Sequence, residues 1–202
     1  MQLFSEYSVL GLLLAGLVGY LLGNFQTAIV LSKLLFHDDV RDHGSGNAGS
    51  TNMVRVFGFR MGLVTFIGDF LKAVLAILLG RLLAGTIGGY MGGLFVVVGH
   101  CWPVFAGFRG GKGIASSFAV AWMCYPLGGL ITTVAAALLF LSTKQVSVMS
   151  LGGTLVFFLC TIIFKQNPLL ITLTVIILLI TFTRHMSNIK RLLQGKEYKF
   201  IR

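Results

Sequence analysis

The sequence predicts an all-α, polytopic membrane protein with seven transmembrane helices, built as a single integral membrane domain over residues 1–202. Three observations support this fold class. Apolar residues make up 56% of the chain and charged residues only 11%, whereas soluble domains carry about 25% charged residues. The mean hydropathy of +0.90 excludes a disordered chain, a nucleic-acid-binding arm and a coiled coil. The distribution of the basic residues then sets the number of helices.

Apolar stretches follow one another along the chain, each separated from the next by a polar segment. A helix needs about 20 apolar residues to cross the hydrocarbon of a bilayer. A short turn at 84–86 separates the second stretch from the third, and a polar, basic tail follows the last. We expect the stretches at 7–35, 56–83, 87–105, 114–141, 148–164 and 169–183.

The stretch at 114–141 decides between six spans and seven, because the sequence YPLGG interrupts it at 125–129. Its full length suits one span, whereas two helices of about 12 residues each would be shorter than a bilayer requires. Only the two-helix arrangement places nearly all basic side chains on one side of the membrane, as the positive-inside rule demands. We therefore expect seven spans, with two short helices hinged at Pro126.

The seven-span arrangement places thirteen of the sixteen Lys and Arg side chains on one side of the membrane. The positive-inside rule makes that side the cytoplasm, with the N-terminus outside and the C-terminus inside. The thirteen are Lys33, Arg41, Arg55, Arg60, Arg109, Lys112, Lys144, Arg184, Lys190, Arg191, Lys196, Lys199 and Arg202. Four polar segments, at 37–55, 108–113, 142–150 and 184–197, share this side. They predict one functional site at the boundary between membrane and cytoplasm.

Two of these segments are rich in glycine and in neutral hydrogen-bond donors, a composition that suits anions. The sequence GSGNAGSTN at 44–52 can form a nest of backbone N–H groups, with Arg55 about one helical turn beyond. The sequence FRGGKG at 108–113 places Lys112 among glycines just before a helix, where N–H groups and the helix dipole favour phosphate. Its spacing is not that of the nucleotide-binding P-loop. A flexible loop and a turn that binds lipid headgroups are the alternatives.

The other two segments carry polar side chains at helical spacing. Ser147 and Ser150 begin a helix, where they share one face or serve only as helix caps. His185 and Asn188 are also three residues apart, and Glu197 follows in the tail. A histidine at such a helix end is commonly an interfacial residue, but beside anion-binding segments it is a candidate phosphate ligand or proton carrier.

Charged residues elsewhere allow more than one interpretation. Asp69 and Lys72 lie three apart within a predicted span and can form either a functional or a structural ion pair. The acidic residues at 38–42 can pair with Arg41, cap a helix or hold a divalent metal. The metal is the least favoured of these, because no further acidic cluster faces the segment.

The chain resembles the bacterial acyl-phosphate:glycerol-3-phosphate acyltransferases, the PlsY family, in four stretches and in their order. These are GSGNAGSTNMVRVFG, GHCWPVFAGFRGGKGIA, KQVSVMS and HMSNIKRLLQGKEYK. The resemblance implies an enzyme of the bacterial cytoplasmic (inner) membrane with its active site on the cytoplasmic side. It would transfer an acyl group from acyl phosphate to the 1-hydroxyl of glycerol 3-phosphate, giving lysophosphatidic acid and inorganic phosphate. This is the first step of bacterial phospholipid synthesis.

The same resemblance assigns site residues motif by motif. The implied catalytic residues are Lys112, His185, Ser150 and Asn188. The implied substrate-binding residues are Ser45, Asn47, Thr51, Asn52, Arg55, Gly110, Gly111, Gly113, Ser147 and Glu197. The glycine-rich turn around Lys112 would hold the acyl phosphate, and Glu197 would order the tail. Either His185 or the phosphate of the substrate would accept the proton.

The resemblance implies acyl phosphate, glycerol 3-phosphate and membrane lipids as ligands. It implies no cofactor, no metal, no nucleic acid and no obligate protein partner. A small transporter or channel for an anionic solute is the main competing class, but it needs polar residues on both faces. Arg81 and Lys165 are almost all that is expected on the far face. A lipid-binding scaffold accounts for the basic tail but not for the segment at 44–52.

Overall fold

The structure, a computed structural model, describes residues 9–200 and contains only helices and their connections over that range. The chain divides between Val120 and Ala121 into two compact parts. The first part contains α1 (Val9–Asn24), α2 (Thr27–Phe36), η2 (Val40–Asp42), α3 (Ser50–Phe57), α4 (Phe59–Cys101), η3 (Val104–Ala106) and most of α5 (Ile114–Cys124). The second part contains α6 (Pro126–Thr143), α7 (Val146–Ile163), α8 (Pro168–Arg184) and α9 (Met186–Leu193). The predicted all-α class is confirmed for the described residues.

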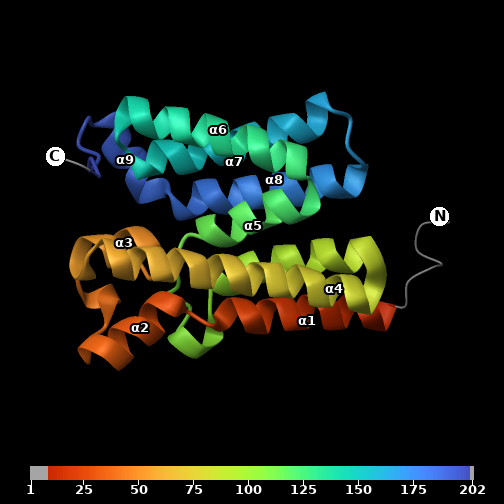
Figure 1. Cartoon of the computed structure of the whole chain (residues 1–202), viewed down its shortest axis with the longest axis horizontal. Helices are drawn as coiled ribbons and strands as arrows, with labels where there is room; N and C mark the ends of the chain where they lie inside the picture. Colours follow the sequence, from red (N-terminus) through yellow and green to blue (C-terminus); the bar gives the residue numbers. More distant parts are fainter. Residues whose placement is uncertain (1–8, 201–202) are drawn as a thin grey trace. The chain divides into compact units, whose positions relative to one another are not determined.

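The long helix α4 is a hairpin rather than one straight helix. Its backbone leaves helical geometry at Ala84 and at Gly85, which has a φ of 56°. Beyond this turn the second half of α4 returns along the first, so that Gly92 packs directly on the backbone of Ala76 (Figure 1). The turn predicted at 84–86 is therefore confirmed, and α4 supplies two antiparallel legs.

Helix α1 packs on the second half of α4 through glycines on both helices. A Cβ atom on Gly19 would lie 2.6 Å from the carbonyl oxygen of Gly92, and one on Gly23 would lie 2.8 Å from the Cα of Gly99. Backbones this close leave no room for a side chain. The glycines therefore set the distance between α1 and α4, and with it the position of the residues that follow each helix.

The stretch expected at 7–35 is interrupted between α1 and α2, at Phe25 and Gln26. The break frees backbone carbonyl groups that need donors in an apolar environment. Gln26 donates to one of them, because its Nε2 lies 2.9 Å from the carbonyl oxygen of Gly23, and the same Nε2 donates to the carbonyl oxygen of His100, at the end of α4, at 3.2 Å. The polar residues in this stretch thus mark a break that is also tied to the end of α4.

The stretch expected at 114–141 is broken at Tyr125, and α6 begins at Pro126, a residue suited to the first position of a helix. The chain reverses here, because Nε1 of Trp122 donates to Oγ1 of Thr133 at 3.2 Å. In a straight helix, residues eleven apart would be separated by about 16 Å. The predicted break is confirmed, but only α5, with 11 residues, is short. Helix α6 has 18, because Pro126 begins it early and it continues beyond the expected end.

Helices α6, α7 and α8 run antiparallel to their neighbours within the second part. Gly152 of α7 faces Leu139 of α6, and the hydroxyl groups of Thr161 and Thr174 join α7 to α8 at 3.2 Å. Helices α8 and α9 meet at His185 with a bend of 63°. This packing brings the α6–α7 connection, the bend and the tail to the same end of the second part.

Within residues 9–200, four helical segments are long and apolar enough to cross a membrane, and they are Val9–Phe36, Phe59–Ala106, Pro126–Thr143 and Val146–Ile163. The bent pair formed by α8 and α9 raises the number to five if it counts as one span. Large apolar side chains on these segments are exposed, among them Leu13, Leu82 and Leu138. Such surfaces suit contact with lipid.

We expect Gly19→Ala to destabilise the protein, because the new methyl group would overlap the backbone of Gly92. Overpacking of this kind typically costs about 1–3 kcal/mol. Gly153→Ala is the matched control, since its methyl group would meet Ala136 at an ordinary 3.4 Å. Thermal unfolding in detergent compares the two variants, and equal melting temperatures would contradict the described packing of α1 on α4.

Candidate active site

Asn52, near the start of α3, shapes the glycine-rich segment that precedes it. Its side chain is 1% exposed. Nδ2 donates to the carbonyl oxygens of Val40 at 2.9 Å and His43 at 3.1 Å, and Oδ1 accepts from the N–H of Ser45 at 2.9 Å. These three bonds hold the loop against α3. Asn52 therefore positions the preceding loop in this structure. Its predicted role in substrate binding would act through the conformation of that loop.

Two glycines let the loop fold this tightly. Gly44 and Gly46 have φ values of 60° and 69°, in a region that residues with a Cβ rarely adopt. The other polar residues predicted to bind substrate in this segment lie at the surface or half-buried: Ser45, Asn47, Thr51 and Arg55. Hydroxyl, amide and guanidinium groups thus flank the start of α3, where N–H groups of the first helical turn also face outward.

The second glycine-rich segment packs closely on the end of α4. The N–H of Gly111 donates to the carbonyl oxygen of His100 at 3.1 Å. A Cβ on Gly111 would overlap the His100 ring, and one on Gly110 would overlap the His100 carbonyl group. Gly113 has a φ of 79°, and α5 begins directly after it. The requirement for glycine at these positions is therefore steric, and it fixes the backbone that carries Lys112.

The two glycine-rich segments meet at Gly111. A Cβ at this position would lie 2.9 Å from the carbonyl oxygen of Ala48, in the middle of the first segment. Lys112 follows directly, so the lysine predicted to bind phosphate lies next to the loop predicted to bind the other anion. The two segments are therefore in contact within the first part, while the single site expected of all four polar segments stays a prediction.

Three buried ionisable side chains lie next to this meeting point. Asp69, Lys72 and His100 are each at most 6% exposed. Nζ of Lys72 lies 2.8 Å from Oδ1 of Asp69 and 3.0 Å from Nδ1 of His100. It also donates to the carbonyl oxygens of Phe25 at 2.6 Å and Gly23 at 3.3 Å, at the break between α1 and α2. The ion pair suggested by the spacing of Asp69 and Lys72 is real, and it belongs to a larger network.

His100 connects this network to the glycine-rich turn. Nδ1 of His100 lies 3.0 Å from Nζ of Lys72 and 3.5 Å from Oδ1 of Asp69, and Nε2 is the atom that lies against Gly111. Sequence reasoning did not single out His100 as a site residue, although it lies in the GHCWPVF stretch. Its partner Lys72 is 28 residues away, which is too far for helical spacing to reveal the contact.

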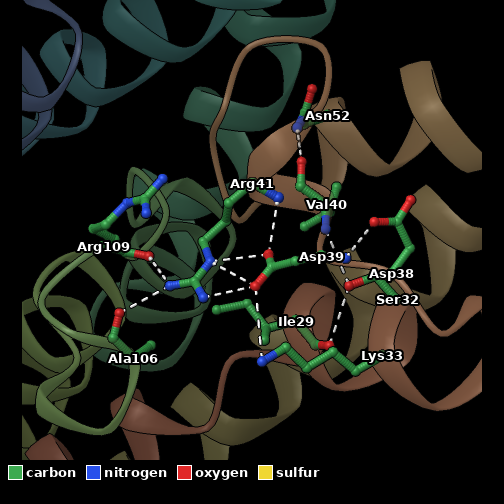
Figure 2. Close-up of polar contacts among 10 residues, drawn as sticks. All are labelled: Ile29, Ser32, Lys33, Asp38, Asp39, Val40, Arg41, Asn52, Ala106 and Arg109. Carbon is green, nitrogen blue, oxygen red and sulfur yellow. Dashed lines mark hydrogen bonds and ion pairs between the residues drawn. The ribbon is translucent and has the colours of Figure 1, made fainter.

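Arg41 makes a second connection between the two glycine-rich segments (Figure 2). Its Nη1 donates to the carbonyl oxygens of Ala106 at 2.8 Å and Arg109 at 3.4 Å. Its Nε and Nη2 lie 2.9 Å and 2.7 Å from the two carboxylate oxygens of Asp39. Two of the alternatives for the acidic residues at 38–42 are therefore observed for Asp39, which pairs with Arg41 and also caps η2 by accepting from the backbone N–H of Arg41 at 3.0 Å.

The guanidinium group of Arg41, bound to the Asp39 carboxylate, holds the pKa of Asp39 at about 2 instead of 3.8. The carboxylate in turn raises the pKa of Arg41. A carboxyl pKa that is lower in the folded state stabilises the fold above the unfolded value, and this contribution is lost as the pH falls toward 2. The pair is therefore fully charged at neutral pH.

The remaining predicted residues lie in the second part, where α8 meets α9. His185 is 3% exposed, and its Nδ1 lies 2.8 Å from the carbonyl oxygen of Thr181. Since a carbonyl oxygen only accepts, Nδ1 carries the proton and Nε2 the lone pair of the neutral ring. Glu197 accepts from Asn188 at 2.6 Å and from Arg191 at 2.8 Å, and so holds the tail against α9.

Ser147 and Ser150 are buried in the first turns of α7. The Ser150 hydroxyl donates to the helix backbone one turn earlier at 2.8 Å. Burial by itself raises the pKa of Glu197, but the hydrogen bonds from Asn188 and Arg191 outweigh it and lower that pKa. Glu197 is therefore a carboxylate at neutral pH, and it holds the tail against α9.

Breaking the buried ion pair in α4 should destabilise the protein strongly. Lys72→Met leaves the Asp69 carboxylate without its ammonium partner, and such a change typically costs about 3–5 kcal/mol. The double variant Asp69→Asn/Lys72→Met removes both charges, so we expect it to melt at a higher temperature than Lys72→Met. A double variant that melts below the single one, in thermal unfolding in detergent, would argue against the pairing.

The amino-acid sequence matches known proteins over most of its length. The family described as Glycerol-3-phosphate acyltransferase matches residues 13–195. The glycerol-3-phosphate acyltransferase of Thermoanaerobacter pseudethanolicus is 41% identical, with 92% of this chain and 94% of the relative covered. That of Finegoldia magna is 41% identical, with 93% and 96% covered.

Solved structures give the same family. The crystal structure of PlsY (YgiH), an integral membrane glycerol 3-phosphate acyltransferase, in its glycerol 3-phosphate form matches with a TM-score of 0.87 and 33% identity over 93% of this chain and 94% of that one. The lysophosphatidic acid form matches with a TM-score of 0.84 and 31% identity over the same shares. This chain therefore belongs to the glycerol-3-phosphate acyltransferase family of the PlsY type.

Proposed function

We propose that this protein transfers the acyl group of an acyl phosphate to the 1-hydroxyl of glycerol 3-phosphate. The products are lysophosphatidic acid and inorganic phosphate, and the reaction opens bacterial phospholipid synthesis. The observation that carries this proposal is the contact of the two glycine-rich segments at Gly111, because it places two loops suited to anions side by side. Both substrates of the proposed reaction are anions, and the relatives are named for acyl transfer involving glycerol 3-phosphate.

The chemistry of an acyl phosphate explains why such a simple set of residues suffices. An acyl phosphate is a mixed anhydride and is already activated. The hydroxyl oxygen of glycerol 3-phosphate forms a bond to the carbonyl carbon, the bond from that carbon to the phosphate oxygen breaks, and the hydroxyl proton passes to a base. The protein holds both substrates and stabilises the negative charge that develops during transfer. A covalent acyl-serine is not required.

The turn at 110–113 is the proposed acyl phosphate site. The steric contact with His100 fixes its backbone, and α5 starts directly after it. A phosphate group there would meet backbone N–H groups, the positive end of a helix dipole and the Lys112 ammonium group. Lys112 is therefore the proposed catalytic cation, which neutralises the leaving phosphate.

The first segment is the proposed site for glycerol 3-phosphate. Its neutral donors bind oxygen atoms without adding charge, and Arg55 supplies the positive charge that a phosphate group needs. Asn52 acts through the loop conformation that it enforces. The proposed ligands in this segment are Ser45, Asn47, Thr51 and Arg55.

The second part contributes the remaining proposed roles. Ser150 and Asn188 are proposed to bind phosphate oxygens, while Ser147 and Glu197 support them. His185 is the proposed proton acceptor. This role is supported by the bond from its Nδ1 to Thr181, which leaves the lone pair on Nε2.

The proposed topology has seven membrane spans, with the N-terminus outside and the C-terminus in the cytoplasm. In support, the described chain offers seven helical legs, which are α1 with α2, the two halves of α4, and α5 to α8. The short α5 needs cover from other helices to lie in the membrane. The proposed location is the bacterial inner membrane, with the active site on the cytoplasmic side, where the positive-inside rule places most basic residues.

The proposed reaction uses acyl phosphate, glycerol 3-phosphate and the surrounding membrane lipids. It requires no cofactor, no metal, no nucleic acid and no obligate protein partner. The apolar acyl chain of the acyl phosphate favours a site at the bilayer boundary. There the chain can remain among the helices while the phosphate group meets the polar loops.

Release of inorganic phosphate from palmitoyl phosphate and glycerol 3-phosphate tests the proposed function directly. We expect the purified protein to release phosphate only when both substrates are present, and Lys112→Met to lose most of the rate, on the order of 100-fold or more. Lys165→Met is the matched control, because Lys165 lies in the α7–α8 connection at the end of the second part away from His185. A folded wild-type protein without turnover would refute the function, and a normal rate for Lys112→Met would refute the role of the lysine.

His185→Gln tests the proposed proton acceptor. Glutamine keeps hydrogen-bonding capacity but cannot take up a proton, so we expect kcat to fall by about 100-fold or more while glycerol 3-phosphate still binds. Steady-state kinetics together with equilibrium binding of glycerol 3-phosphate measure both quantities. A variant that keeps kcat within a few-fold of the wild type would show that the phosphate of the substrate accepts the proton.

A further inference from the structure

We propose that Arg41 is a positioning residue, which sets the spacing between the two glycine-rich segments for acyl transfer. The inference rests on the proposed function and adds to it a residue outside both motifs. Arg41 precedes the first segment, whereas the carbonyl groups that it binds belong to Ala106, just before the second segment, and to Arg109, near its start. One side chain therefore joins the entries to both segments (Figure 2).

The guanidinium group of Arg41 is held on two sides, which makes it a rigid connection. On one side its Nε and Nη2 meet both carboxylate oxygens of Asp39, and the backbone N–H of Arg41 also donates to Oδ1 at 3.0 Å. On the other side Nη1 reaches the carbonyl oxygen of Ala106 at 2.8 Å. A bidentate pair of this kind fixes direction as well as distance.

Low exposure separates this contact from an ordinary surface ion pair. The side chains of Arg41 and Asp39 are 14% and 16% exposed, whereas Lys33, the second cation near Asp39 at 3.8 Å, is 58% exposed. Exposed ion pairs contribute little to the free energy of folding, because solvent screens the attraction between the charges. Solvent screens a partly buried bidentate pair less. The low pKa of Asp39 agrees with this, because the carboxylate stays charged throughout the neutral range.

The carbonyl groups that Arg41 binds lie where the backbone of the second segment changes direction. Gly107 and Phe108, between Ala106 and Arg109, have φ values of 63° and 59°. Arg41 therefore holds both ends of a tight turn that leads directly into Gly110. On the far side of the same segment, Gly111 rests on His100 and near Ala48. The second segment is thus held on one side by Arg41 and on the other by His100. A substitution of Arg41 removes the first of these contacts without touching the second.

The first segment is fixed from the same place. Val40, the neighbour of Arg41, is fully buried and accepts from Asn52 Nδ2 through its carbonyl oxygen. Its N–H donates to the hydroxyl group of Ser32 in α2 at 3.3 Å. Through Val40, the backbone beside Arg41 is therefore anchored to α2 and α3 independently of the Arg41 side chain. Removing it should change how the two segments sit relative to each other while the helices keep their packing.

Lysine cannot replace arginine in this role. An ammonium group is a point charge, whereas the planar guanidinium group reaches Asp39 and two carbonyl groups at once. Arg41→Lys therefore keeps the charge but loses the geometry. Arg41→Ala loses both, although Asp39 retains Lys33 nearby, so its carboxylate is not left without a cation.

The experiment compares wild type, Arg41→Lys, Arg41→Ala and the control Arg60→Ala, which alters an exposed arginine at the start of α4. Misplacement of reacting groups by about 1 Å costs on the order of 100-fold. We expect kcat/KM for phosphate release from palmitoyl phosphate and glycerol 3-phosphate to fall by about that factor in both Arg41 variants. Arg60→Ala should stay within twofold. An active wild type with unchanged Arg41 variants, or rescue by lysine, would overturn the inference.

Amide hydrogen exchange gives a readout that does not depend on turnover. We expect faster exchange in Arg41→Ala at 104–113, because Ala106 and Arg109 lose their donor, with unchanged exchange in α1 and α4. Unchanged exchange at 104–113 would overturn the role of Arg41 even if the protein catalysed nothing. A wild type without activity, together with faster exchange in the variant, would refute the proposed function alone.

Discussion

A single buried ammonium group, Nζ of Lys72, holds the first part of this protein together. It binds the Asp69 carboxylate, the His100 ring and the two carbonyl groups freed where α1 gives way to α2. In an apolar environment each of these groups would be costly without a partner. The position of α1, the end of α4 and the ring that supports Gly111 therefore depend on one side chain that meets no substrate in our account.

Glycine makes the other half of the arrangement possible, and it acts in two different ways. Between helices, as at Gly19 and Gly92, it lets backbones touch. In the second glycine-rich segment, Gly110 and Gly111 let a loop rest on the carbonyl group and ring of His100. The glycines of this motif are thus required by the protein's own packing, in addition to any approach of phosphate to the backbone. A motif residue and a packing residue are here the same residue.

Much of this could be predicted from the sequence, because local signals were strong. The apolar stretches, the turn at 84–86 and the break at Pro126 follow from composition and from proline and glycine placement. The contact of the two glycine-rich segments followed from charge asymmetry, which placed both at one end. The apolar stretches and the proline and glycine positions are local signals, whereas the charge asymmetry is a property of the whole chain.

What the sequence did not reveal are contacts between single residues far apart in the chain. Lys72 meets His100, and Arg41 meets Ala106, 65 positions later. Neither pair has a spacing that a helix or strand would impose. The sequence also did not reveal the break at Phe25. The carbonyl groups freed there accept hydrogen bonds from Gln26 and from Lys72, and the contact with Lys72 spans 47 positions of the chain. The full length of α6 was underestimated because the expected end was placed by hydropathy, while the helix extends into the polar residues that follow.

We infer that the two glycine-rich segments act as one anion site. Amide hydrogen exchange of the wild-type protein with and without glycerol 3-phosphate tests this inference. We expect the ligand to protect amides in both segments, 44–52 and 108–113, over the same range of ligand concentration, because they are in contact at Gly111. Protection of one segment alone, or of neither while the ligand binds elsewhere, would contradict it.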